Sequence, residues 1–291
     1  MTPNNDQTMT SHNDQTIQKD QQLPLSVPAF EFRQSDTPIL VSMPHSGLAL
    51  TSEVEAGLTE QARKLPDTDW YIPELYDFLE TLGVGCIKAN YSRYVIDLNR
   101  PYDDKPLYQT KTTGLFPDIL FEDAPVFEPN KAPNETQKAA YKEQIWKPYH
   151  NTIEQELKRL KEKFGYAILF DAHSIAAEVP MLFDGLLPDF NWGTNEGQSC
   201  TDLIANVVTQ ILRPNYTQVL NGRFKGGYIT RQFGQPEKGI HAIQLELSQA
   251  TYLDEEAKKA GRYQLDDNKL PFIKQQLKEL IEGCLAVSLN E

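Results

Sequence analysis

The sequence predicts an α/β fold with a mostly parallel sheet that helices cover on both faces. From Pro38 onward, short apolar runs rich in β-branched residues alternate with longer segments of helical periodicity. Such alternation is typical of parallel sheets, because each crossover helix packs back onto the sheet. No convincing boundary divides the body of the chain. We therefore expect a disordered polar tail over residues 1–24 and a single α/β domain over residues 25–291.

The individual elements follow from local composition and periodicity. The tail repeats Asn-Asp-Gln-Thr and holds too few apolar side chains to offset the entropy cost of ordering. Strands are predicted at Ile39–Met43, Val84–Lys88, Tyr94–Leu98, Ala167–Phe170 and Ile240–Leu247. Helices are predicted at Tyr71–Leu82, around Ile153–Phe164, at Thr201–Leu212 and at Leu270–Val287. The segment Pro101–Pro133 has six prolines and no periodicity, which predicts a long loop of the kind that often serves function.

Composition excludes several classes of protein. The 291 residues include 28 Lys and Arg against 41 Asp and Glu, a formal net charge of −13. Nucleic-acid binding and basic membrane-surface helices both need clustered cations, and none occur. No apolar segment approaches the roughly 18 residues of a membrane span, and the N-terminus does not resemble a signal peptide. Three widely separated cysteines predict no disulfide framework, so we expect a reducing, cytoplasmic location.

Two histidines follow predicted strands. His45 comes two residues after the strand Ile39–Met43, and His173 comes three residues after Ala167–Phe170. Ligands of open α/β sheets bind beyond the carboxyl ends of the strands, where both histidines are expected. Two histidines and a carboxylate would form a catalytic zinc site with an open position. The alternative is that one of the two histidines is structural and the other simply buried.

The third ligand has several candidate sources. We favour Asp69, with Asp67 as runner-up, and Glu53 and Glu55 also follow the first histidine. The competing interpretation of the aspartates is that one of them caps the helix beginning near Trp70. Asp171 lies two residues before His173, and its carboxylate is placed to orient a metal ligand without itself binding the metal.

A general base is predicted on the strand Ile240–Leu247. Period-two alternation places Gln244 and Glu246 on one face and the isoleucine and leucines on the other. A glutamate within a hydrophobic strand is costly unless it is paired or used, although a Glu at a strand end can also face water. The same alternation turns His241 away from Glu246. His150 lies on an apolar helix face and is interpreted as a packed residue.

Arginines mark a possible site for carboxylates. They stand near strand ends or in a Gly-rich loop: Arg93, Arg100, Arg223 and Arg231. A guanidinium matches a carboxylate in bidentate fashion, so an acidic small molecule is the expected ligand. The alternative is structural ion pairing, for example between Arg93 and Asp97. The Gly226-Gly227 pair fits no phosphate-loop pattern.

Six short segments, in order along the chain, carry most of these candidates: Pro44–Gly47, Asp67–Trp70, Ser92–Pro101, Asp171–Ile175, Asn221–Gly227 and Gln244–Leu247. Together they resemble the N-formylglutamate amidohydrolase (N-formylglutamate deformylase) family, from about Ile39 to Tyr252. The resemblance implies a three-layer α/β/α sandwich around a mixed sheet, related to the zinc carboxypeptidases. It also implies hydrolysis of N-formyl-L-glutamate to formate and L-glutamate, the last step of one route of histidine degradation.

The resemblance also implies roles for particular residues. His45 and His173 correspond to zinc ligands and Glu246 to the base, while Asn99 and Arg100 resemble a pair that holds a substrate carboxylate. Zinc carboxypeptidases take their acidic ligand from a His-x-x-Glu motif, but Leu48 stands three residues after His45. The acidic ligand must therefore come from elsewhere, so Asp69 rests on the residue argument alone.

Three alternatives stay open at this point. The same scaffold can serve a deacylase of acetyl or succinyl amino acids or of peptides. A non-catalytic binding protein for acidic metabolites is a second alternative, although the residues for catalysis are present. A serine hydrolase using Ser46 or Ser174 is the third, but neither serine lies in a Gly-x-Ser-x-Gly turn.

Overall fold

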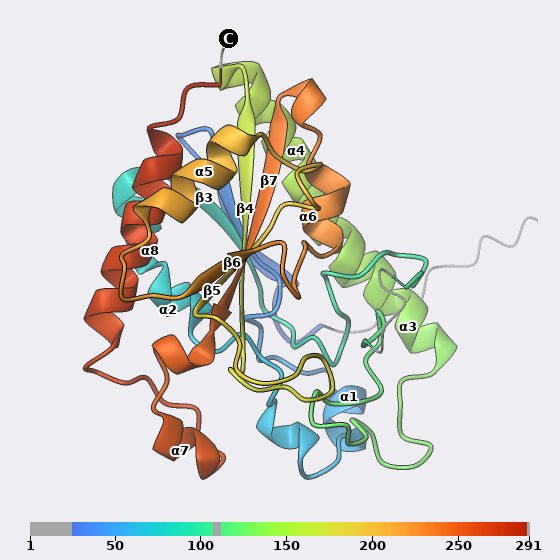
Figure 1. The fold of residues 1–291 in the computed structure, drawn as a ribbon. Coiled ribbons are helices and arrows are strands. Elements are labelled where there is room, and N and C mark those ends of the chain that lie inside the picture. The colour runs from blue at the N-terminus through green and yellow to red at the C-terminus, as the bar shows by residue number, and fades with distance from the viewer. Residues whose placement is uncertain (1–24, 107–111, 290–291) are drawn as a thin grey trace, which may run out of the picture.

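The computed structural model describes residues 25–106 and 112–289, so the predicted tail over 1–24 lies outside the described residues. Seven strands form one mixed sheet in the order β1-β3-β2-β4-β7-β5-β6 (Figure 1). They are β1 Phe30–Arg33, β2 Ile39–Met43, β3 Gly85–Ala89, β4 Ala167–Ile175, β5 Phe190–Gly193, β6 Gln218–Leu220 and β7 Ile240–Ser248. Four neighbouring pairs are parallel, whereas β1 with β3 and β5 with β7 are antiparallel. The predicted α/β fold with a mostly parallel mixed sheet is confirmed.

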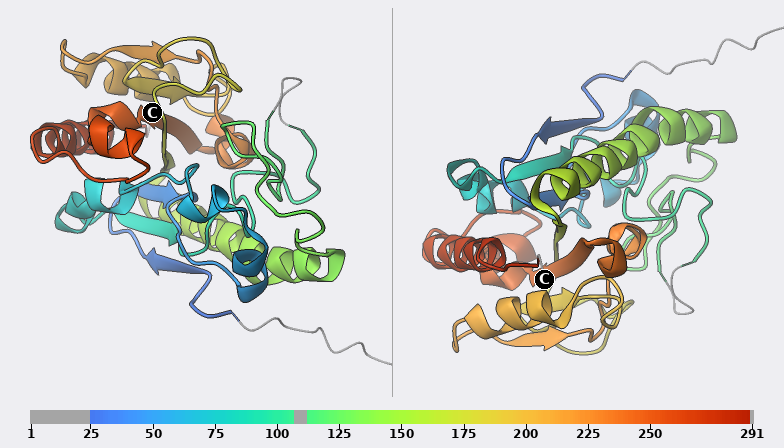
Figure 2. Two further views of the ribbon diagram at one scale, coloured as in Figure 1. Left: turned by 90° about the horizontal axis from the view of Figure 1, so that it is seen from below. Right: turned by 90° about the horizontal axis from the view of Figure 1, so that it is seen from above.

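Helices lie on both faces of the sheet, as the views along the strands in Figure 2 show. One face is covered by α2 Ile72–Leu75, α5 Asp202–Ile211 and α8 Leu270–Leu285, and the other by α4 Lys147–Phe164 and α6 Tyr228–Phe233. The remaining α-helices are α1 Ser52–Gly57, α3 Glu135–Tyr141 and α7 Glu255–Lys259. A π-helical turn, Lys142–Trp146, joins α3 to α4, and short 3₁₀ turns span Ala62–Lys64, Asp77–Leu82, Pro236–Lys238 and Gln249–Thr251.

The core divides into two layers because side chains alternate across each strand. In β4, Ile168 and Phe170 pack under α5 and α8, whereas Ala167 and Leu169 pack under α4. All nine residues of β4 are buried, as expected for a central parallel strand covered on both faces.

Two predicted elements are wrong. Tyr94–Leu98 is a series of turns, not a strand: Val95 N bonds to Ser92 O, Arg100 N bonds to Asp97 O, and no strand in the described part of the chain pairs with it. The apolar run in this segment is buried in the loop layer beside the site, so a buried loop has the composition of a strand. The helix predicted over Tyr71–Leu82 is interrupted at Tyr76, whose φ of −105° ends α2 before a 3₁₀ turn continues.

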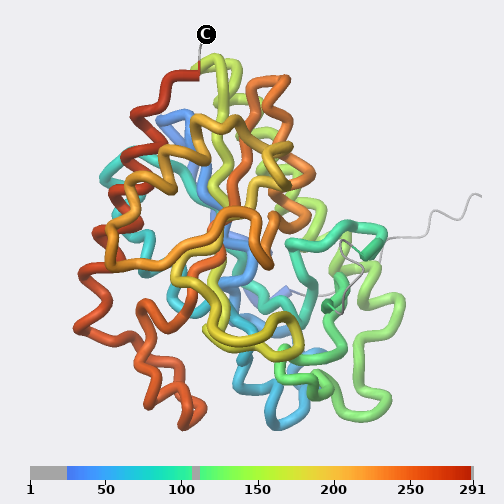
Figure 3. The backbone as a smooth tube through the Cα atoms, viewed as in Figure 1, coloured from blue at the N-terminus to red at the C-terminus, as the bar shows by residue number. Residues whose placement is uncertain are grey.

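The parallel topology brings the carboxyl ends of β2, β4 and β7 to one edge of the sheet. Long connections gather there, including the loop after β4 and the segment 112–134, which belongs to the connection between β3 and α3 (Figure 3). As predicted, the described part of the segment 101–133 contains no helix or strand. Within the described ranges, no helix has the length and apolar character needed to cross a bilayer. The relation to zinc carboxypeptidases stays a prediction.

Candidate metal and amide-hydrolysis site

Three buried side chains from distant parts of the chain converge at this edge. His45 lies in the turn after β2, Asp69 lies in the loop before α2, and His173 lies within β4. One ligand atom from each lies within 4.8 Å of the others. The turn that carries His45 packs closely on a neighbouring loop, because a Cβ at Gly47 would overlap the carbonyl of Tyr91. The predicted set of two histidines and Asp69 is therefore brought together.

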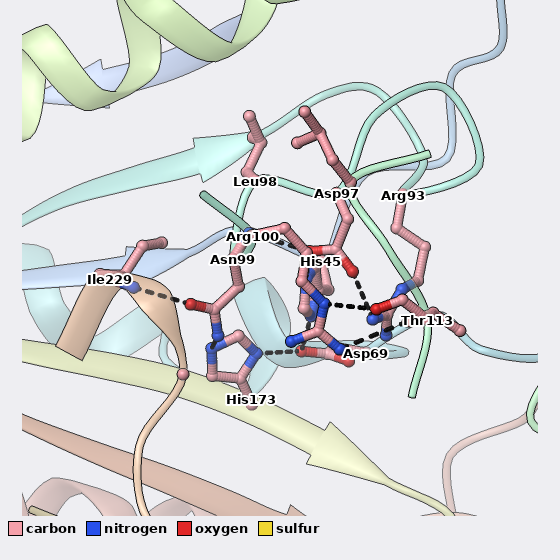
Figure 4. A network of polar contacts seen from close by, with 12 residues as sticks. His45, Asp69, Arg93, Asp97, Leu98, Asn99, Arg100, Thr113, His173 and Ile229 are labelled. Atoms are coloured by element: carbon pink, nitrogen blue, oxygen red, sulfur yellow. Dashed lines mark hydrogen bonds and ion pairs between the residues drawn. The ribbon is translucent and has the colours of Figure 1, made fainter. Parts of the chain in front are cut away.

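The orientation of both imidazoles suits a cation between them (Figure 4). His45 Nε2 lies 2.7 Å from Asp97 Oδ1, and His173 Nε2 lies 3.1 Å from Asp171 Oδ2. Both Nδ1 atoms then face Asp69 Oδ2, at 3.7 Å from His45 and 3.0 Å from His173. A carboxylate behind a ring is the usual support of a metal-bound histidine. The amide nitrogen of Asn99 also lies 3.0 Å from His173 Nε2, so this nitrogen has a second polar neighbour besides Asp171. The donor set fits a zinc ion with an open coordination position.

The electrostatics of the two histidines differ. Burial lowers the pKa of His45, and the charge of Arg93 acts in the same direction. Burial alone would also lower the pKa of His173, but the Asp171 and Asp69 carboxylates raise it well above its ordinary value. This concentration of negative charge around two buried rings attracts a cation.

The other candidate acidic ligands lie elsewhere. Asp67 turns away and accepts the backbone N–H of Phe121 at 3.2 Å, and burial raises its pKa to about 6. Glu53 and Glu55 are exposed in the first turn of α1. The capping interpretation of the aspartates is wrong, because α2 begins after Tyr71 without any side-chain cap.

Glu246 lies beside the cluster on the neighbouring strand. In the parallel register of β4 and β7, His173 pairs with Glu246 and Asp171 pairs with Gln244. Glu246 is only 8% exposed, and burial raises its pKa to about 8. Gln244 donates to Glu246 Oε2 at 3.3 Å and accepts the N–H of Gly227 at 2.6 Å. A carboxyl with a pKa near neutrality is suited to take up and release a proton.

The arginines divide into two groups. Arg93, Arg100 and Arg223 line the pocket over the cluster, whereas Arg231 lies on α6 outside that lining and donates to Gly226 O. The expected ion pair of Arg93 is present, with its Nη2 2.6 Å from Asp97 Oδ2. Arg100 donates to Thr113 O and Thr112 Oγ1, both at 2.8 Å.

The same pocket has an apolar wall. Ile175, Leu182, Phe121 and Phe224 line it and belong to a small hydrophobic cluster that is separate from the two main core layers. Charged groups and an apolar wall together suit a small acidic molecule with an aliphatic chain.

A family model described as N-formylglutamate amidohydrolase matches residues 37–253, which include every residue of the site. The chain belongs to the N-formylglutamate amidohydrolase family. The N-formylglutamate deformylase of Pseudomonas aeruginosa is 54% identical over 252 residues, covering 86% of this chain and 95% of that protein. The deformylase of Pseudomonas putida is 53% identical over 252 residues, covering 86% of this chain and 94% of that protein.

Solved structures show the same fold at lower identity. The N-formylglutamate amidohydrolase of Ralstonia eutropha JMP134 superposes with a TM-score of 0.75 at 20% identity, covering 88% of this chain and 97% of that one. The gene product Atu2144 of Agrobacterium tumefaciens gives a TM-score of 0.65 at 13% identity, covering 89% and 96%. This amidohydrolase fold thus persists where the sequences have diverged widely.

Two members of the site in this amidohydrolase were not predicted from the sequence. Asp97 was expected only as an ion-pair partner of Arg93, but it also contacts His45. Gln244, which bonds to both Glu246 and Gly227, had no predicted role. The alternation along β7 was a usable signal for Gln244, since the amide shares the face of Glu246. Asp97 carried no such signal, because its segment is irregular.

Proposed function

We propose that this protein hydrolyses N-formyl-L-glutamate to formate and L-glutamate. The single observation that carries the proposal is Glu246 facing the cluster of His45, Asp69 and His173 inside a pocket lined by arginines. The family membership and the names of the two Pseudomonas relatives support the same substrate. We also propose, in line with the family resemblance, that the reaction belongs to histidine degradation and takes place in the cytoplasm.

His45, Asp69 and His173 would hold the metal, for which we propose one zinc ion. Zinc bound by three protein ligands polarises a carbonyl and lowers the pKa of a water molecule toward about 7. Asp97 and Asp171 keep the two rings oriented, as their contacts with the Nε2 atoms indicate.

Glu246 is the proposed general base and acid. It takes a proton from the attacking water and later donates that proton to the nitrogen of the departing glutamate. Its buried position on β7, beside His173 in the register, supports this role. Because the Glu246 carboxyl is buried away from bulk solvent, its proton is not lost to water and stays available for the departing amine.

We propose that the polar residues lining the pocket recognise the substrate. N-formylglutamate carries two carboxylates, and we assign them to Arg100 and Arg223, with Asn99 beside them. Arg93, which is tied to Asp97, is the proposed donor to the formyl oxygen as negative charge develops there. Arg231 stays a candidate on the sequence argument alone.

Formate release from N-formyl-L-glutamate tests the proposal directly, before chelation, after chelation and with zinc added back. We expect activity that chelation removes and zinc restores. N-acetyl- and N-succinyl-glutamate, assayed in parallel, are expected to be poor substrates. A folded, zinc-loaded protein that releases no formate but deacylates another amide would overturn the assigned substrate. Activity that persists in protein shown to be metal-free would overturn the proposed dependence on zinc.

A further inference from the structure

Two aromatic side chains hold the main chain on either side of Asn99. Trp146 Nε1 donates to the carbonyl of Arg100 at 2.9 Å, and His150 Nε2 donates to the carbonyl of Leu98 at 2.9 Å. We propose that Trp146 and His150 are positioning residues that hold Asn99 and Arg100 in the geometry that recognises a substrate carboxylate. The inference rests on the proposed function, because it assumes that the pair contacts the substrate.

The helix presents the two rings as one unit. Trp146 and His150 are four residues apart, and their rings stack with centroids 3.8 Å apart. Trp146 ends the π-helical turn Lys142–Trp146, and Pro148 follows two residues later. A proline ring clashes with the carbonyl four residues earlier, so the wider π-turn accommodates it inside a continuous helix. The widened turn sets the direction in which the indole leaves the helix.

A second helix, α6, holds the side chain of Asn99. The N–H of Ile229, in the first turn of α6, donates to Asn99 Oδ1 at 2.9 Å (Figure 4). Asn99 reaches this position because Gly227 has no side chain, and a Cβ there would overlap the Asn99 amide. Two rings of α6, those of Tyr228 and Phe233, pack on His150 with centroids 5.4 and 5.9 Å away. The segment is thus held between α4 and α6.

The hydrogen-bond chemistry of His150 suits a fixed donor. Its Nε2 must carry the proton, because the partner is a carbonyl oxygen. Its Nδ1 is buried and has no hydrogen-bond partner among residues 25–106 and 112–289, and burial lowers the pKa of the ring to about 3. The ring is therefore neutral at physiological pH, and its Nε2–H stays a hydrogen-bond donor without the ring becoming charged.

The position of these contacts predicts which kinetic step they affect. Loss of either N–H leaves a buried carbonyl unpaired, so the segment shifts to find a new donor. Asn99 and Arg100 then lose their alignment with the carboxylate, whereas Glu246 on β7 keeps its own support from Gln244. We therefore expect weaker recognition of the substrate rather than slower proton transfer.

Matched variants separate the hydrogen bonds from the packing. Trp146→Phe and His150→Phe keep an aromatic ring but remove the donor, whereas His150→Gln keeps an N–H. Trp192→Phe is the control, since Trp192 Nε1 makes a comparable bond to Gln218 on the far side of β7. Kinetics are measured with N-formylglutamate and with its two monoamides, N-formylglutamine and N-formylisoglutamine, each of which lacks one carboxylate.

For the two donor-free variants we expect KM for N-formylglutamate to rise about tenfold with kcat changed far less. We also expect them to lose the preference for N-formylglutamate over one monoamide, which is the loss we expect of Arg100→Ala. His150→Gln and Trp192→Phe are expected to keep both. If the donor-free variants fold and keep the preference that Arg100→Ala loses, the positioning role is wrong. If Arg100→Ala itself keeps the preference, the assignment of Arg100 in the proposed function is wrong.

A measurement without substrate tests the same contacts independently of activity. The amides of Asp97, Asn99 and Arg100 are all hydrogen-bonded, to Leu115 O, Asp97 Oδ1 and Asp97 O respectively. Hydrogen exchange in a peptide covering these residues is expected to accelerate several-fold in Trp146→Phe and His150→Phe, but not in Trp192→Phe. Unchanged exchange would overturn the positioning role even if the protein acts on a different substrate.

Discussion

His173 and Glu246 are direct neighbours across the parallel pair of β4 and β7, so that a metal-ligand candidate and a base candidate share one face of the sheet. Neighbouring strands in a sheet lie about 4.8 Å apart, which places the two side chains within reach of one bound molecule. The pairing depends on register, because a shift by one residue would turn Glu246 to the opposite face. The arrangement leads to the first prediction.

Replacing Glu246 with Gln is expected to lower kcat for formate release by about 10²–10⁴-fold, because the amide cannot carry the proton to the leaving nitrogen. The shape and the hydrogen bond to Gln244 are largely kept, so zinc content is expected to stay near the wild-type value. Near-normal turnover in this variant would show that Glu246 is not the base.

Asp97→Asn is expected to weaken zinc binding by about 10–100-fold, because His45 loses the ionised acceptor that fixes its ring. Arg93 loses its ion-pair partner at the same time. Zinc affinity is measured by competition with a chromophoric chelator. Asp103→Asn is the control, since Asp103 forms an exposed ion pair with Lys105. Equal affinities of the two variants would contradict the supporting role of Asp97.

The identity of the acidic ligand is tested by a pair of variants. Asp69→Asn is expected to weaken zinc binding by more than the 100-fold or so expected for loss of a supporting carboxylate. Asp67→Asn is expected to keep zinc, because the Asp67 carboxylate faces the N–H of Phe121 rather than the histidines. If Asp67→Asn loses zinc and Asp69→Asn keeps it, the two assignments must be exchanged.

The stability of the protein is expected to fall in acid partly through His150. Its pKa is lowered in the folded state to about 3, against an ordinary value of 6.5, so folding favours the neutral ring. The contribution is complete above about pH 6.5 and is lost as the pH falls from there toward 3. The slope for one such group is at most about 1.4 kcal/mol per pH unit.

Urea unfolding at several pH values between 7 and 4.5 measures this slope. His150→Gln, which does not titrate, is expected to lose stability less steeply with falling pH than the wild type. Parallel slopes for the two proteins would mean that His150 makes no contribution to the acid sensitivity.

Much of the fold could be predicted from the sequence, because the central strands contain continuous apolar runs. The buried runs of β2, β4 and β7 are apolar enough to predict interior strands, and the predicted bounds of β2 and β7 agree closely with those of the structure. The strand predicted at Ala167–Phe170 is five residues too short, because β4 continues through the polar residues to Ile175 and so contains His173. The short strands β1, β5 and β6 were not predicted. The strand predicted at Tyr94–Leu98 was wrong, since a loop buried beside a site also becomes apolar.

The sequence alone also named His45, Asp69, His173 and Glu246, because strand ends and strand parity are local properties that a sequence pattern records. Their convergence, and the exclusion of Asp67, were decided only by the tertiary structure. Asp97 contacts His45 from a loop, and the rings of Trp146 and His150 reach the loop around Asn99. In each case the partner lies about 50 residues away along the chain. No local pattern encodes such contacts, because the free energy that selects them comes from packing between segments that meet only in the folded protein.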